Sequence, residues 1–235
     1  TKKVNGVIPV LEVIKEKCVN CQKCIAVCPV KFCNDGSGEY VTVNHDMCIG
    51  CGHCIEACDK AGHYARKRID DFEEFHRDLQ KGEKIIAIVA PAVAVSFPNQ
   101  LKKINTLLKN MGVYKVFDVS FGAEITTYEY LKTYKKGSNT TIIAQPCPAI
   151  VSYIEVYKPS LIKYLAPTHS PALDAAIWIH SQHEYKNIKI AFVGPCSAKR
   201  REFNDEHTKG HISYNVTFHS LEEYIKNENV SLNRL

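Results

Sequence analysis

The sequence predicts an α+β unit at the N-terminus followed by an α/β domain whose parallel sheet is covered by helices. Nine of the 11 cysteines lie between residues 18 and 58, which marks off a cysteine-rich first unit. From residue 84 onward, short apolar runs alternate with stretches of helical periodicity, as is typical of a parallel sheet buried on both faces. We therefore divide the 235 residues into an N-terminal unit (1–68), a connecting helix (69–83) and the α/β domain (84–235).

The elements of the α/β domain follow from this alternation. Strands are expected at 84–90, 114–120, 140–145 and 188–194, where β-branched and other apolar residues predominate. Helices are expected at 99–111, 122–136, 148–157 and 171–184, and a further helix begins at about residue 220.

Composition and charge exclude several classes of protein. The 30 basic and 25 acidic residues leave a net charge of only +5 without a dense basic block, so nucleic-acid binding is not expected. No apolar run approaches the roughly 18 residues of a membrane span, and the N-terminus lacks a signal-peptide core. A cytoplasmic location is therefore expected, where cysteines bind metal more often than they form disulfides.

Two cysteine runs in the N-terminal unit share one spacing. CVNCQKCIAVC begins at Cys18 and CIGCGHCIEAC begins at Cys48, and both have the C-x2-C-x2-C-x3-C pattern of bacterial two-cluster ferredoxins. In such a run three thiolates hold one cubane and the fourth holds the other. We therefore predict a ferredoxin-like unit with two 4Fe–4S clusters, cluster one held by Cys18, Cys21, Cys24 and Cys58, and cluster two by Cys48, Cys51, Cys54 and Cys28.

Neighbouring residues bear on this interpretation. Gly50 and Gly52 allow the backbone to approach the sulfur atoms and to direct N–H donors toward them. A pair of zinc sites is the alternative, but zinc sites usually take two separated cysteine pairs rather than a run of four. Cys33 lies outside both patterns and is interpreted as a small buried thiol.

Two further cysteines, Cys147 and Cys196, each lie in a Pro-Cys pair directly after an expected strand. Ligands of open α/β sheets gather at the carboxyl ends of the strands, so the two thiols are candidates for one shared site. Lys199 follows Cys196 by three residues and offers a cation for an anionic ligand. From the residues alone, a shared metal site and two separate buried thiols remain equally good interpretations.

Residues 84–203 resemble the catalytic domain of FeFe hydrogenases. The resemblance rests on five segments in the same order, VAPAVAV (89–95), KVFDVSFGAEIT (115–126), PCPAIVSYIEVYKP (146–159), LAPTHSPAL (165–173) and GPCSAKRREF (194–203). The cysteine-rich unit in front is also arranged as in that family, so the resemblance covers nearly the whole chain.

The resemblance implies roles for particular residues. In the family, four cysteines in three loops hold the H-cluster, which is a 4Fe–4S cluster joined to a di-iron unit. Cys147 and Cys196 match two of those four ligands, and Lys199 matches the lysine that contacts a cyanide ligand of the di-iron unit. Residues 90–92, including Pro91 and Ala92, match the loop that lines the di-iron pocket, and Ser170 with Pro171 matches a pair that supports it.

The sequence departs from the family in two places. The third ligand loop is missing, because no cysteine follows Cys196, so the chain as given supplies two of the four H-cluster ligands. Pro146 stands where efficient members have a proton-carrying cysteine, which makes the chain more similar to the slow or hydrogen-sensing subgroup.

These departures leave several expectations open. The chain is a fragment, one chain of a split hydrogenase whose partner carries the missing cysteine loop, or a degenerate relative, and a fragment is favoured. The expected activity is that of an iron–sulfur electron-transfer protein relaying electrons to an H-cluster site, of the hydrogen:ferredoxin oxidoreductase type, with a redox partner such as ferredoxin. A non-catalytic electron carrier or an iron–sulfur assembly protein of the same superfamily is the alternative.

Overall fold

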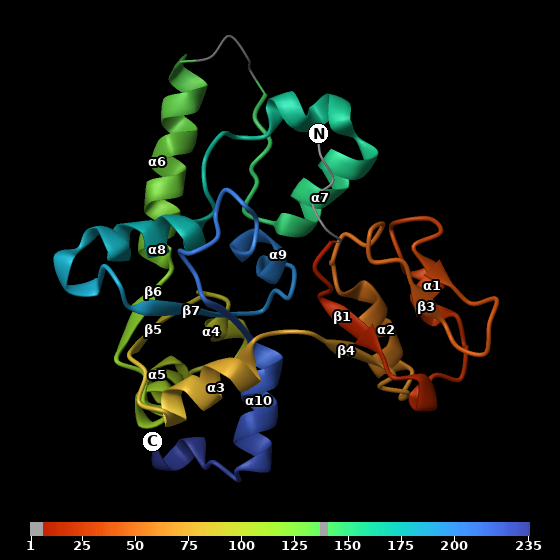
Figure 1. Cartoon of the computed structure of the whole chain (residues 1–235), viewed down its shortest axis with the longest axis horizontal. Helices are drawn as coiled ribbons and strands as arrows, with labels where there is room; N and C mark the ends of the chain where they lie inside the picture. Colours follow the sequence, from red (N-terminus) through yellow and green to blue (C-terminus); the bar gives the residue numbers. More distant parts are fainter. Residues whose placement is uncertain (1–6, 137–140) are drawn as a thin grey trace. The chain divides into compact units, whose positions relative to one another are not determined.

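The computed structural model describes residues 7–136 and 141–235, which form two compact units (Figure 1). The N-terminal unit runs to Ile69 and also takes in Pro148–Ile162. The C-terminal unit consists of Asp70–Cys147 and Lys163–Leu235. The chain therefore passes between the two units more than once, and a helix from the middle of the sequence packs with the cysteine-rich unit.

The N-terminal unit consists of short elements. Its strands pair as two antiparallel ribbons, β1 (Leu11–Val13) with β4 (Arg66–Arg68) and β2 (Asn34–Asp35) with β3 (Thr42–Val43). Its helices are η1 (Lys15–Lys17), α1 (Lys23–Ala26), α2 (His53–Lys60) and α7 (Pro148–Tyr157), and η2 (Pro159–Tyr164) follows α7.

The C-terminal unit is built on a parallel four-stranded sheet in the order β6-β5-β7-β8. The strands are β5 (Ile85–Val89), β6 (Lys115–Asp118), β7 (Lys189–Gly194) and β8 (Tyr214–Thr217). The helices are α3 (Phe72–Gln80), α4 (Val93–Ser96), α5 (Leu101–Asn110), α6 (Ser120–Lys136), α8 (Pro171–Ser181), η3 (His183–Tyr185), α9 (Lys199–Phe203), α10 (Phe218–Asn227) and η4 (Leu232–Arg234). The α/β architecture agrees with the predicted fold class.

Helices cover both faces of this sheet. In Figure 1, α3, α5 and α10 lie on one side of the strands and α8 on the other. Every residue of β5 is buried, as are all those of β7 except Lys189, which is why their sequences read as uninterrupted apolar runs. None of the helices within residues 7–136 and 141–235 is long and apolar enough to span a membrane.

The strand order places a switch point between β5 and β7. The chain leaves β5 toward β6 on one side of the sheet and then returns to β7 on the other side. Ligands of open α/β sheets bind where the strand order reverses in this way, outside the carboxyl ends of the two strands. Those ends are the loops after Val89 and after Gly194, and the N–H of Ala90 still donates to the carbonyl oxygen of Val193 at 2.8 Å.

The structure corrects three sequence-based expectations. The strand expected at 140–145 is absent from the described part of that segment, where Ile143 forms only an isolated bridge with Leu165; Thr140 lies outside the described residues. The strand β8, which has only four residues, was not predicted from the sequence. The expected connecting helix is α3, and it is part of the C-terminal core rather than a linker, because Phe75 and Leu79 are buried there.

Gly122 allows α6 and α8 to approach closely. A methyl group at Gly122 would lie 2.1 Å from the carbonyl oxygen of Pro171 and 2.9 Å from the Cβ of Ala175. Both contacts are shorter than van der Waals distance, and one of them is to backbone that cannot rotate away. The crossing of these two helices therefore depends on a residue without a side chain.

Gly122→Ala is expected to destabilise the C-terminal unit by about 1–3 kcal/mol, the usual cost of overpacking, although alanine is the better helix former. Thr127→Ala is the matched control, because Thr127 is exposed on the same helix and the change improves helix propensity without crowding. Urea unfolding of both variants measures the difference. Equal stability of the two variants would contradict the prediction.

Candidate functional site

One pocket of the N-terminal unit is lined by the four cysteines assigned to cluster one. Its walls include Cys18, Cys21, Cys24 and Cys58. Cys24 lies on α1 and Cys58 at the end of α2, so the fourth sulfur comes from the second cysteine run. Arg66 of β4 completes the same wall.

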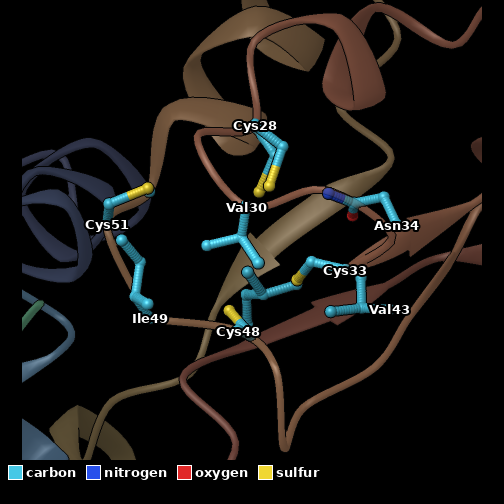
Figure 2. A pocket seen from close by; sticks show the side chains of 11 residues that line it. Cys28, Val30, Cys33, Asn34, Val43, Cys48, Ile49 and Cys51 are labelled. Atoms are coloured by element: carbon cyan, nitrogen blue, oxygen red, sulfur yellow. The ribbon is translucent and has the colours of Figure 1, made fainter. Parts of the chain in front are cut away.

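A second pocket is lined by the four cysteines assigned to cluster two. Its walls include Cys28, Cys48, Cys51 and Cys54, and here the fourth sulfur comes from the first run. Figure 2 shows the side chains of Cys28, Cys48 and Cys51 directed toward one space, with Val30 and Ile49 as apolar neighbours. The exchange of the fourth cysteine between the runs is the arrangement that the spacing predicts.

Backbone N–H groups point at the sulfur atoms in both pockets. Val41 donates to Cys18 at 3.4 Å and Ala65 donates to Cys58 at 3.2 Å. In the second pocket Gly50 donates to Cys48 at 3.3 Å, and its φ of +75° is one that side-chain-bearing residues rarely adopt. Such donors stabilise negative charge on thiolate sulfur and tune clusters bound by it.

Burial favours the protonated form of several of these thiols. It raises the pKa of Cys54 to about 11 and raises the pKa of Cys24 and of Cys51 as well. The guanidinium of Arg66 opposes the rise in pKa at both Cys24 and Cys54. Binding of iron, which needs thiolates, must therefore release protons from these sites.

Cys33 is a fifth cysteine in the second pocket. It is buried and its thiol lies 3.7 Å from the carbonyl oxygen of Asn44. A hydrogen bond with Cys48, and then burial, raise the pKa of the Cys33 thiol above its ordinary value. The interpretation as a small buried thiol agrees with this burial, but its place beside Cys28 and Cys48 was not foreseen.

Helix α7 packs against the second cysteine run. Tyr153 and Tyr157 contact the cluster formed by Val30, Cys33 and Ile49. The hydroxyl of Tyr157 donates to the carbonyl oxygen of Met47 at 2.8 Å, directly before Cys48. The helix begins at Pro148, the residue after Cys147.

Cys147 and Cys196 come together in the C-terminal unit. Cys196 lies in the loop after β7, at the switch point. Burial raises the pKa of the Cys196 thiol and the nearby sulfur of Cys147 adds to the rise, while the N–H groups of Lys199 and Ala198 oppose it. Cys147 is exposed and follows an extended segment outside the sheet, so the expectation that both thiols end sheet strands was wrong for this one.

A buried lysine accompanies the thiol pair. Lys199 is the first residue of α9 and is 7% exposed. Its Nζ forms an ion pair with Glu202 one turn later and lies 5.9 Å from the centre of the Phe203 ring. This partner was not predicted from the sequence, although the i, i+3 spacing signals it.

The remaining predicted pocket residues lie at loop and helix starts. Pro91 is exposed and Ala92 half-buried in the loop after β5, across the switch point from Cys196. Ser170 is buried and caps α8, where its Oγ accepts a hydrogen bond from the N–H of Leu173 at 3.5 Å. This cap holds the Ser-Pro pair in place at the helix start.

Side-chain hydrogen bonds hold the segment that leads to Cys147. The hydroxyl of Tyr130 on α6 donates to Oε1 of Gln145 at 2.7 Å. Nε2 of Gln145 donates to the side-chain oxygen of Thr168 at 2.7 Å. Pro146 follows with no N–H and no titratable group, so the position beside Cys147 has no proton to transfer.

Four thiols around each of two pockets, with N–H groups directed at the sulfur atoms, are the donor set of iron–sulfur clusters, and they define the class of the N-terminal unit. Residues 11–59 match the family model described as a 4Fe-4S dicluster domain. Residues 83–235 match the model described as the iron only hydrogenase large subunit, C-terminal domain. The chain belongs to the iron-only hydrogenase family.

Individual relatives agree with this assignment. Iron hydrogenase 1 of Clostridium pasteurianum is 25% identical over 228 residues, covering 72% of this chain and 40% of the relative. Protein NAR1 of Arabidopsis thaliana is 27% identical over 195 residues, covering 70% of this chain and 40% of the relative. Cytosolic Fe-S cluster assembly factor NAR1 of Yarrowia lipolytica is 26% identical over 137 residues, covering 53% of this chain and 28% of the relative.

The chain spans at most about two fifths of the length of these curated relatives. These relatives include a hydrogenase and an iron–sulfur cluster assembly factor.

Proposed function

We propose that this chain relays electrons to and from a hydrogenase active site of the slow or hydrogen-sensing type, of which it forms one part. The observation that carries the proposal is the pairing of Cys147 with Cys196 beside the buried Lys199, at the switch point of the sheet. A lysine at the carboxyl ends of parallel strands suits an anionic ligand. Pro146 beside Cys147 favours slow turnover over fast, because it offers no proton.

The order of the relay follows from the helix that packs on the second cysteine run. Because α7 contacts Val30 and Ile49 and begins one residue after Cys147, we assign cluster two to the exchange of electrons with that site. Cluster one then serves a redox partner such as ferredoxin. Its ligand Cys21 is exposed and is followed two residues later by the exposed Lys23, which suits an acidic partner.

The residues of this chain do not complete an H-cluster ligand set. Beyond the N-terminal unit the sequence contains Cys147 and Cys196 and no other cysteine. A complete ligand set would need cysteines from outside these 235 residues, for instance from a second chain. The residues present therefore account for electron relay and for part of a binding site, but not for a step of hydrogen chemistry.

The resemblance to Protein NAR1 favours a second candidate, a non-catalytic role in iron–sulfur assembly. In that case the two thiols would serve a cluster without a di-iron unit, and Lys199 would stay paired with Glu202 as a structural contact.

Infrared spectroscopy of the complete gene product, purified without oxygen, distinguishes the two candidates. The hydrogenase proposal expects carbonyl and cyanide bands, and it expects Lys199→Gln to shift or remove the cyanide bands. Lys186→Gln is the matched control, because Lys186 is exposed in the same unit. Absence of all such bands, with iron present, would leave the assembly role.

A further inference from the structure

Arg66 is buried in the middle of the cysteine-rich unit. It is 4% exposed, whereas the next residue on β4, Lys67, is exposed. Alternate residues of a strand face opposite sides, and the pairing of Arg66 with Val13 turns its side chain inward. Two neighbouring cations on one short strand thus have opposite environments.

The guanidinium of Arg66 lies between the two cysteine sets. It lines the first pocket together with Cys24 and Cys58. It also lies close enough to Cys54, which lines the second pocket, for its positive charge to lower the pKa of that thiol. One side chain therefore acts on a predicted ligand of each cluster.

The two terminal nitrogens of this guanidinium, Nη1 and Nη2, have no hydrogen-bond partner among the described residues. A buried cation without an anion is costly, because burial removes its hydration without replacing it. A 4Fe–4S cluster held by four thiolates is anionic, and reduction makes it more so. The clusters are thus the counter-charge that this side chain requires.

We propose that Arg66 is a shared electrostatic tuning residue, whose N–H groups donate to the sulfur atoms of both clusters and whose charge stabilises their reduced states. The inference rests on the proposed two-cluster relay. Cluster potentials follow net charge, hydrogen bonds to sulfur and solvent exposure, and a buried guanidinium acts on the first two. Because one cation acts on ligands of both clusters, it raises both potentials.

The test compares Arg66→Gln, which removes the charge, with Arg66→Lys, which keeps it. Lys67→Gln is the matched control, because it removes one charge from the neighbouring position on the solvent side. Each protein is reconstituted, its iron content is measured, and midpoint potentials are determined by redox titration followed with electron paramagnetic resonance.

In Arg66→Gln both midpoint potentials are expected to become more negative. At a fixed potential the ratio of reduced to oxidised cluster should fall at least about tenfold, which is about 59 mV for one electron. Lys67→Gln should shift much less, because water and salt screen an exposed charge. Arg66→Lys should lie between Arg66→Gln and the unmodified protein.

Unchanged potentials in a fully loaded Arg66→Gln protein would overturn the inference while leaving the two-cluster relay intact. If Arg66→Gln does not assemble its iron–sulfur clusters, the midpoint potentials of Arg66→Lys test the inference instead. A lysine lacks the planar guanidinium that reaches both ligands. Potentials equal to those of the unmodified protein in that variant would also overturn it. Failure of the unmodified chain to bind about eight iron atoms would contradict the relay itself.

Discussion

Removal of iron and sulfide is expected to unfold the N-terminal unit and to leave the C-terminal unit folded. The N-terminal unit has strands of two or three residues and, apart from α7, α-helices of four and eight. Its buried apolar clusters are small, consisting of Leu11, Cys24, Val41, Cys54 and Ile55 in one and of Val30, Cys33 and Ile49 in the other. Cys24 and Cys54 of the first apolar cluster are themselves predicted iron–sulfur ligands. Part of the core is therefore made of residues expected to bind the iron–sulfur clusters.

A core of this size cannot offset the entropy of ordering the chain, so the clusters must supply folding free energy. The buried Arg66 adds to the cost, because without clusters its charge has no ion-pair partner among the described residues. The C-terminal unit differs, since Phe75, Ile85 and Ile88 belong to one extended core around the sheet. It does not depend on any thiol of the N-terminal unit for that core.

Hydrogen exchange followed by mass spectrometry measures the two units separately. Amides of β4 and α2 should lose their protection in the iron-free protein, whereas those of β5 and β7 should keep theirs and serve as the internal control. Helix α7 should lose protection with the N-terminal unit, because Tyr153 and Tyr157 pack there. Persistent protection of α2 after complete loss of iron would contradict the prediction.

Sequence patterns located the C-terminal elements well where burial is continuous. The expected strands 84–90 and 188–194 correspond to β5 and β7, and the expected helix 171–184 corresponds to α8. The expectation failed at 140–145, an apolar run that bridges Leu165 instead of joining the sheet. Pairing partners are set by tertiary contacts, and an isolated apolar run does not reveal them.

Spacing located the cysteines but not their surroundings. The repeat of C-x2-C-x2-C-x3-C predicted which thiols share a pocket, because each ligand set is encoded within short segments. The burial of Arg66 was not predicted, because the sequence Arg-Lys-Arg is typical of an exposed basic stretch. Only its pairing with β1 shows that Arg66 faces inward. Likewise, nothing in the sequence shows that α7 packs with the cysteine-rich unit, about 80 residues away along the chain.

The crossed ligation of the clusters makes a second large effect predictable. Because Cys58 lines the pocket of the first run and Cys28 that of the second, each fourth cysteine should serve the cluster of the other run. Single variants do not show this, since loss of either cysteine removes one cluster under both arrangements. Double variants distinguish the two arrangements, because the iron that remains shows whether the two replaced cysteines bind the same cluster or different clusters.

Cys21→Ala with Cys58→Ala is expected to retain about four iron atoms per chain, because both residues belong to cluster one. Cys51→Ala with Cys58→Ala should retain almost none, because it removes a ligand from each cluster. Cys33→Ala is the control and should keep about eight, because Cys33 lies outside both cysteine runs although it lines the second pocket. The opposite result in the two pairs would mean that each run holds its own cluster, and the shared position of Arg66 would then require a different explanation.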